Sequence, residues 1–270
     1  MSAVSAPNGS FAEYVVAESE RGIVPKPRTW TFEQASQLGI ASFTALQTLY
    51  QSLELPSPFD ARSGPERTIL IWGGSSSVGQ YAIQFAKLGG FRVVTTASPK
   101  NFDLVKDLGA DEVFDYGDES VVDKIRAYTG NALEIAIDTI SEGKTPKQVT
   151  GAIGGKGGRV AIILPYESPR QDVEVKFDRC TELLKRVRSL PLLMPFLLIC
   201  FQESKGKWYV DLFTKILATG KIKPNQVHLQ PGGLASVKEG IQYMQEGKVI
   251  ELIRLRKTGE AEVDTNLTRT

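Results

Sequence analysis

The stretch that decides the fold is Thr68-Ile-Leu-Ile-Trp-Gly-Gly-Ser-Ser-Ser-Val-Gly79, which Gln80-Tyr-Ala-Ile-Gln-Phe-Ala-Lys-Leu-Gly89 follows. Its first part is a continuous apolar run, which is typical of a strand covered on both faces in a parallel sheet. A turn of small residues comes next. After it, apolar residues recur at helical spacing, at Ala82, Ile83, Phe85, Ala86 and Leu88. The sequence therefore predicts a strand, a tight turn and a helix in immediate succession.

The turn has the composition of a phosphate-binding loop. In dinucleotide-binding folds the glycines let the backbone approach a pyrophosphate, which free N–H groups at the helix N-terminus then hold. Gly74 and Gly79 match the first and third glycines of the motif G-x-G-x-x-G, and Ser76 stands in the place of the middle one. The strand before and the helix after favour a pyrophosphate site over the alternative, a β–α turn that binds no ligand.

A second strand, expected over 91–96, ends where a dinucleotide fold recognises the adenosine ribose. NAD-binding versions place an acidic residue about 20 residues after the glycines, on the ribose 2′-hydroxyl. Ser98 stands at that place, and Lys100 follows it. With a cation nearby and no carboxylate to repel it, a 2′-phosphate is favoured, which predicts NADPH rather than NADH. The alternative is that Lys100 simply faces solvent, as most lysines do.

Strand and helix patterns alternate through the middle of the chain. This alternation indicates an α/β fold with a doubly wound parallel sheet, that is, a Rossmann fold. The expected strands are 68–72, 91–96, 112–115, 133–138 and 157–163, and the expected helices between them are 78–89, 101–108, 119–128 and 145–153. Outside this core we expect a strand pair within 1–27, a helix capped by Thr31, a helix over 42–51, a connector over 55–65, helices near 178–188 and 206–219, and a strand-and-helix unit around 225–247.

Composition and charge exclude several classes of function. The 270 residues are enough for one or two domains with a sizeable core. Because 32 Lys+Arg residues nearly balance 31 Asp+Glu residues, no general attraction to nucleic acid or to an anionic membrane is expected.

The N-terminus lacks a signal-peptide pattern, so the expected location is cytoplasmic. The apolar stretch 190–201 is too short and proline-broken to span a bilayer, and is expected in the core, at a subunit contact, or as a wall for an apolar substrate.

The sequence also predicts that no metal is bound. Cys180 and Cys200 are too few for a disulfide framework, and neither lies in a C-x-x-C pair. The single histidine, His228, and these two separated cysteines cannot assemble one of the usual structural or catalytic zinc sites.

Several segments of the chain resemble the medium-chain dehydrogenases/reductases. Asn8-Gly-Ser-Phe-Ala-Glu-Tyr-Val-Val16 resembles the end of their GroES-like catalytic domain, and Thr31-Phe-Glu-Gln-Ala-Ser-Gln-Leu-Gly-Ile-Ala-Ser-Phe-Thr-Ala-Leu-Gln47 resembles the helix pair after it. The resemblance extends to Ser75-Ser-Ser-Val78, Leu108-Gly-Ala-Asp-Glu-Val-Phe-Asp-Tyr116 and Pro231-Gly-Gly-Leu234. Ser98-Pro-Lys-Asn101, with the later Phe-Asp-Tyr116, is most similar to fungal trans-acting enoyl reductases that partner polyketide synthases.

This resemblance implies an activity, a cofactor and a partner. The implied enzyme is an NADPH-dependent oxidoreductase of secondary metabolism. It transfers hydride to the β-carbon of an α,β-unsaturated polyketide thioester, after which a proton reaches the α-carbon. The implied partner is a polyketide synthase or its carrier-bound thioester, and the chain is expected to be a monomer or homodimer. The alternatives are a zinc-free quinone reductase of the same superfamily and a truncated, non-catalytic protein that binds the cofactor.

Site residues carry over by their place in the motifs. Those implied to bind the cofactor are Ser75, Ser76, Ser77 and Val78 at the pyrophosphate, Ser98, Pro99, Lys100 and Asn101 at the 2′-phosphate, Tyr116 beside the adenosine half, and Ile163 and Leu164 over the nicotinamide. Those implied to line the substrate pocket are Ile40, Ala41, Ser42, Phe43, Thr44, Ala45, Leu46 and Gln47. Thr44, with backbone N–H groups near Ser42, is the candidate to stabilise an enolate, and no acid–base pair is identified. For Tyr116 and Ile163, ordinary packing is the alternative.

The chain departs from the family pattern at both ends. Family members carry a longer N-terminal part that forms most of a barrel-like domain, and near the C-terminus 247–253 is shorter than its counterpart. The expected organisation is therefore a remnant of the GroES-like domain at 1–27, a helical connector lining the cleft at 28–65, the dinucleotide-binding domain at 66–225, and a C-terminal strand and helix with a polar tail at 226–270. Either a truncated gene model or a real, diminished protein accounts for the difference.

Overall fold

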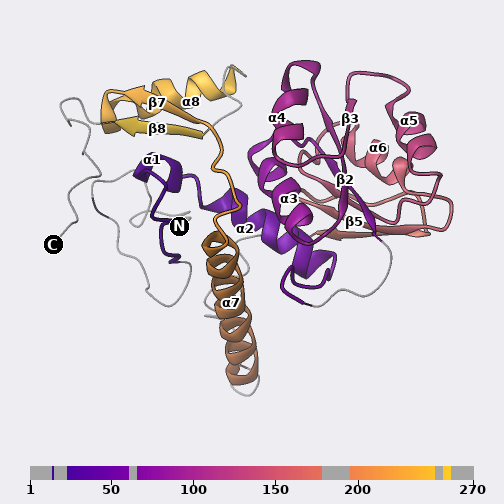
Figure 1. Cartoon of the computed structure of the whole chain (residues 1–270), viewed down its shortest axis with the longest axis horizontal. Coiled ribbons are helices and arrows are strands. Elements are labelled where there is room, and N and C mark those ends of the chain that lie inside the picture. The colour runs from indigo at the N-terminus through magenta and orange to yellow at the C-terminus, as the bar shows by residue number, and fades with distance from the viewer. Residues whose placement is uncertain (1–13, 15–22, 61–65, 178–194, 247–251, 257–270) are drawn as a thin grey trace.

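A six-stranded parallel sheet forms the centre of the molecule (Figure 1). The computed structural model describes residue 14 and residues 23–60, 66–177, 195–246 and 252–256. The strands lie in the order β3-β2-β1-β4-β5-β6, and every neighbouring pair is parallel. Their bounds are β1 Thr68–Trp72, β2 Arg92–Ala97, β3 Glu112–Asp115, β4 Ile135–Asp138, β5 Gly158–Ile162 and β6 Val173–Phe177. This is the strand order of a dinucleotide-binding fold, which confirms the predicted Rossmann class.

Helices cover both faces of this sheet (Figure 1). The alternation of side chains along β1 shows why: Ile69 and Ile71 enter one buried cluster, whereas Leu70 and Trp72 enter the other. On the first face the cluster includes residues of α2, α3, α4 and α7, and on the second it includes residues of α5 and α6. The helices are α1 Phe32–Ala35, α2 Ile40–Gln47, α3 Ser77–Leu88, α4 Phe102–Asp107, α5 Val121–Tyr128, α6 Thr145–Ala152, α7 Pro195–Ala218 and α8 Val237–Gln245.

Most predicted elements lie within a residue or two of the observed ones, and the differences have physical reasons. Thr31 caps α1 as expected, in a capping box with Gln34. Strand β6 was not predicted, although Val-Glu-Val-Lys-Phe at 173–177 alternates as a one-sided strand does. Helix α7 begins at Pro195, eleven residues before the predicted start; as the first helical residue, a proline costs no hydrogen bond.

Some expectations concern residues outside the described part of the chain. The strand pair within 1–27 and the helix near 178–188 belong here, as does the end of the connector over 55–65. The helix over 42–51 is present as α2, which continues into a π-helical turn, Thr48–Ser52.

A separate unit follows α7 (Figure 1), and the Gln226 carbonyl at its start accepts a hydrogen bond from the Gln37 side chain, two residues after α1, at 3.0 Å. It consists of β7 Val227–Pro231, a 3₁₀ turn Gly233–Ser236, α8 and β8 Leu252–Arg256, with the two strands parallel. The segment that leads to it is tied back to the sheet domain by an amide pairing. The Gln84 side chain accepts a hydrogen bond from the Lys223 N–H at 2.7 Å and donates to the Lys223 carbonyl at 3.2 Å.

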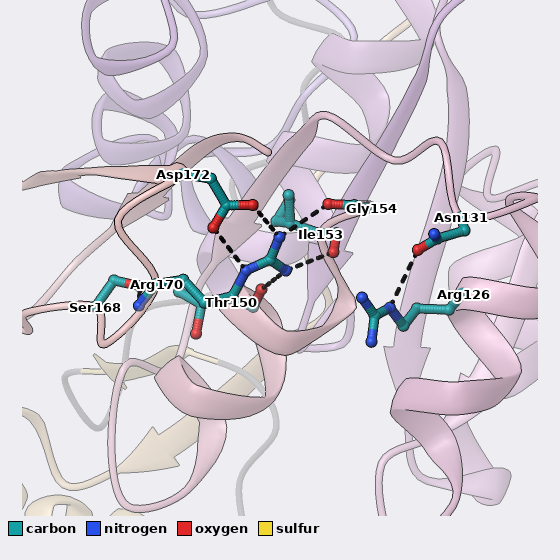
Figure 2. Close-up of polar contacts among 8 residues, drawn as sticks. All are labelled: Arg126, Asn131, Thr150, Ile153, Gly154, Ser168, Arg170 and Asp172. Carbon is teal, nitrogen blue, oxygen red and sulfur yellow. Dashed lines mark hydrogen bonds and ion pairs between the residues drawn. The ribbon is translucent and has the colours of Figure 1, made fainter. Parts of the chain in front are cut away.

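One arginine, Arg170, fixes the connection between β5 and β6 (Figure 2). The Arg170 guanidinium donates to the carbonyls of Thr150 (3.0 Å), Ile153 (2.6 Å) and Gly154 (2.9 Å). It also makes a two-pronged contact with Asp172, at 3.0 and 2.5 Å. All five of its donors are thus used. The same ion pair lowers the pKa of the Asp172 carboxyl. One side chain therefore satisfies carbonyls at the end of α6 and fixes the loop that precedes β6.

We expect Arg170→Ala to lower the free energy of unfolding by about 2 kcal/mol, because three carbonyls and a carboxylate lose their donor. Arg170→Lys should recover less than half of that loss, since an ammonium cannot reproduce the planar fork. Urea unfolding of the purified variants measures both. The matched control is Arg126→Ala, whose guanidinium makes a single 3.3 Å bond to Asn131 and should matter little (Figure 2). Equal effects of the two alanine variants would contradict this assignment.

Candidate functional site

The predicted cofactor segments all follow the carboxyl ends of sheet strands. Residues 75–78 follow β1, 98–101 follow β2, Tyr116 follows β3, and 163–164 follow β5. Because the strands are parallel, these ends share one edge of the sheet. The direction of the strand order reverses between β1 and β4, and α/β sheets of this kind bind ligands in the crevice at that point.

The turn after β1 is hydrogen-bonded to the strand on its first side, β2. The Gly73 N–H donates to the Thr96 hydroxyl at 3.0 Å, and the Gly74 N–H donates to the Thr96 carbonyl at 2.9 Å. Thr96 is fully buried. The backbone of the turn therefore has its first two N–H groups satisfied by β2.

On its other side the turn contacts the residue after β4. The Thr139 hydroxyl lies 2.8 Å from the Trp72 carbonyl and 3.0 Å from the Gly73 carbonyl. It also lies 2.8 Å from the Ser76 hydroxyl. Ser76 is the N-cap of α3, and its hydroxyl accepts a hydrogen bond from the Gly79 N–H at 3.0 Å.

Three N–H groups at this turn have no acceptor among the described residues. Those of Ser77 and Val78 open α3, where helix geometry provides no carbonyl one turn earlier. No described residue accepts a hydrogen bond from them or from the Ser75 N–H. Ser75, Ser77 and Val78 are all partly exposed. The positive end of the helix dipole adds to these donors, so the arrangement suits an anion.

Two glycines let α3 pack directly on the turn. A Cβ at Gly79 would lie 2.3 Å from the Gly73 carbonyl oxygen and 2.8 Å from the Gly74 Cα. A Cβ at Gly74 would lie 2.1 Å from the Thr95 hydroxyl. Both positions of the motif thus exclude any side chain, whereas the middle position accommodates Ser76.

The loop after β2 presents a hydroxyl and an exposed lysine. The Ser98 hydroxyl accepts a hydrogen bond from the Asn101 amide at 3.1 Å, and its own hydrogen meets no acceptor among the described residues. Pro99, Lys100 and the exposed Tyr116 flank it, and the Tyr116 N–H donates to the Ala97 carbonyl at 3.4 Å.

The loops after β4 and β5 are joined through a buried carboxylate. Asp138 accepts from the N–H groups of Ile140 (3.0 Å) and Ser141 (2.8 Å) and from the Thr145 hydroxyl (2.9 Å). Burial raises the pKa of the Asp138 carboxyl, while these donors oppose the rise. The Ser141 hydroxyl in turn accepts from the Ile163 N–H at 3.0 Å. Through Ser141, Asp138 therefore holds the start of the segment 163–164, which is expected to lie over the nicotinamide.

The predicted substrate segment forms α2, which packs beside α3. Six of its residues are buried: Ala41, Ser42, Thr44, Ala45, Leu46 and Gln47. Thr44 is 8% exposed, and Phe43 is half-buried with its ring edge against Phe213. Ile40, at 53%, is the exposed apolar side chain of the segment.

The described residues contain no group of three or more His, Cys, Asp or Glu side chains that could hold a metal ion. Over the same ranges, no helix is long and apolar enough to cross a membrane.

Comparison with known proteins gives three kinds of match: a family model, relatives in sequence and solved structures. The family model described as zinc-binding dehydrogenase matches residues 77–189. The trans-enoyl reductase ACTTS2 of Alternaria alternata is 39% identical over 244 residues, which cover 89% of this chain and 69% of that protein. The trans-enoyl reductase gkaC of Penicillium citrinum is 34% identical over 253 residues, covering 89% and 68%.

The chain belongs to the medium-chain dehydrogenase/reductase family. Within that family it is homologous to the fungal trans-enoyl reductases, as the sequence predicted. The crystal structure of CurK enoyl reductase shares the fold, with a TM-score of 0.68 at 19% identity over 87% of this chain and 65% of that one. This family member spans about two thirds of the length of the relatives it matches.

The residues that hold the candidate site in place were not among those predicted from the sequence. No recognisable motif contains Thr96 and Thr139, whose side chains fix the turn after β1. The same is true of Asp138 and Ser141, whose side chains fix the loops after β4 and β5. The available signal was polar residues at the ends of otherwise apolar strands, as in Thr95-Thr96 and Asp138-Thr139.

We expect Gly79→Ala to lower the free energy of unfolding by about 2–3 kcal/mol, because its methyl group would force α3 away from the turn. Gly151→Ala is the matched control, since the nearest atom to its Cβ would be a Val122 methyl at 3.6 Å. In the helical position of Gly151, alanine should raise the free energy of unfolding by about 0.5–1 kcal/mol. Chemical denaturation compares the two, and a tolerated Gly79→Ala would show that the packing is looser than described.

Proposed function

We propose that this chain is an NADPH-dependent reductase of α,β-unsaturated thioesters, acting in trans beside a polyketide synthase. The observation that carries the proposal is the set of N–H groups of Ser75, Ser77 and Val78, which find no acceptor in the described part of the chain and lie where the strand order reverses. Homology to the fungal trans-enoyl reductases supports the reaction and the carrier-bound substrate.

The turn after β1 would hold the pyrophosphate. Its three donors and the α3 dipole favour a negative charge, and Gly74 and Gly79 keep the turn close to the helix. Among described residues, the first turn of α3 carries no acidic side chain that would repel the anion.

The loop after β2 would select NADPH over NADH. Ser98 has a hydroxyl hydrogen to donate, and the Lys100 ammonium supplies positive charge. Asp115 on β3 pairs with Ala97, the residue before Ser98, and so brings a carboxylate to this end of the sheet. That carboxylate accepts a hydrogen bond from the Gly117 N–H at 2.8 Å. Pro99 and Asn101 shape the loop, and Tyr116 would lie beside the adenosine.

The segment after β5 and the exposed end of α2 would enclose the reacting groups. When bound, NADPH supplies hydride for the β-carbon of the substrate. Ile163 and Leu164 would cover the nicotinamide, and Ile40 and Phe43 would contact the acyl chain. Thr44 remains the candidate to stabilise an enolate oxygen, together with N–H groups at the start of α2.

Binding measurements test the cofactor assignment. We expect NADPH to bind about tenfold more tightly than NADH, which corresponds to about 1.4 kcal/mol. Lys100→Ala should abolish most of this preference by weakening NADPH binding alone. Lys106→Ala, an exposed lysine on α4, is the control and should leave the ratio unchanged. Equal affinities, or an unchanged ratio in Lys100→Ala, would refute the 2′-phosphate site.

Turnover tests the reaction. With a crotonyl thioester and NADPH, we expect oxidation of NADPH in proportion to formation of the saturated thioester, followed by absorbance and mass spectrometry. A quinone of similar size should be reduced far more slowly. Preferential reduction of the quinone would support the quinone reductase alternative, and cofactor binding without turnover of either would support the non-catalytic one.

A further inference from the structure

We propose that Thr139 is a positioning residue for the pyrophosphate site and acts through Ser76. The pair would replace the middle glycine of the phosphate-binding motif. This inference rests on the proposed function, because it assumes that the turn after β1 holds the cofactor.

The direction of the hydrogen bonds follows from the number of hydrogens. Thr139 faces two carbonyl oxygens, of Trp72 at 2.8 Å and Gly73 at 3.0 Å, and carbonyls only accept. Its single hydroxyl hydrogen is therefore used there, so the 2.8 Å contact with Ser76 requires Ser76 to donate. The Ser76 oxygen then accepts from the Gly79 N–H at 3.0 Å.

This relay fixes the Ser76 side chain toward the protein. The middle glycine of the motif normally lets the backbone approach the pyrophosphate without hindrance. A serine side chain there is compatible with that approach only when it is turned away from the ligand. The bonds to the Gly79 N–H and to Thr139 hold it in such a position.

Thr139 does not act by touching the ligand. It is 3% exposed and lies beyond β4, the strand on the far side of the turn from β2. The bonds from Gly73 and Gly74 to Thr96 do not depend on it, so the turn keeps its attachment to β2 when the Thr139 hydroxyl is removed.

A double-mutant cycle separates positioning from general damage. Thr139→Val removes the hydroxyl at nearly constant volume, and we expect it to weaken NADPH binding about tenfold. Thr139→Ser should bind within about twofold of the wild type. In the Ser76→Gly background there is no side chain left to orient, and a glycine N-cap is well tolerated. Thr139→Val should there change NADPH binding less than twofold.

Binding of adenosine 2′-phosphate is a control measurement, because a variant that is damaged throughout the site would bind this compound more weakly too. It carries the 2′-phosphate but no pyrophosphate, so wild type and Thr139→Val should bind it equally. Thr139→Ala serves the same comparison if the valine packs badly.

The outcomes separate the two proposals. A wild-type chain that binds no NADPH overturns the proposed function and this inference with it. If the wild type binds NADPH, equal losses with Thr139→Val in both Ser76 backgrounds, or a parallel loss of adenosine 2′-phosphate binding, overturn the positioning role alone.

Discussion

The structure depends on one constraint, the need to satisfy the backbone where β1 ends and turns sharply into α3. A buried turn cannot leave its polar groups unpaired, because each would cost a few kcal/mol. Thr96 supplies partners from β2, and Thr139 supplies a hydroxyl from beyond β4. The turn is thereby fixed between its two neighbouring strands. Among the described residues, the N–H groups of Ser75, Ser77 and Val78 find no acceptor, which is the condition for binding an anion.

The parallel sheet extends this constraint to the whole site. Since every strand runs in the same direction, loops that are far apart in sequence reach the same edge. Ser141 shows how two of them are joined there: its N–H donates to Asp138 and its hydroxyl accepts from the Ile163 N–H, so one residue links the loops after β4 and β5. The strand order, and not a single motif, therefore determines which residues meet at the candidate site.

The sequence predicted the parts of the fold whose signals are local. Ile69 to Trp72 form an apolar run because both faces of β1 are covered, and Gly74 and Gly79 mark the turn because no side chain fits there. Thr139 and Ser76 are 63 positions apart, and their contact requires that β1 and β4 be neighbours. No local pattern contains that information. Edge strand β6 was missed for a different reason, since its alternation is short and only partly buried.

Backbone groups next to the sheet are satisfied by different chemistry at the amino ends and at the carboxyl ends of the strands. At the amino edge, where β5 and β6 begin, Arg170 satisfies carbonyls with a charged group whose donors are all used. At the carboxyl edge the turn after β1 is held by neutral hydroxyls, those of Thr96, Thr139 and Ser76. Neutral hydroxyls fix the backbone without adding charge, so in the function proposed above the charge is recognised by the N–H groups of α3 and by the loop after β2.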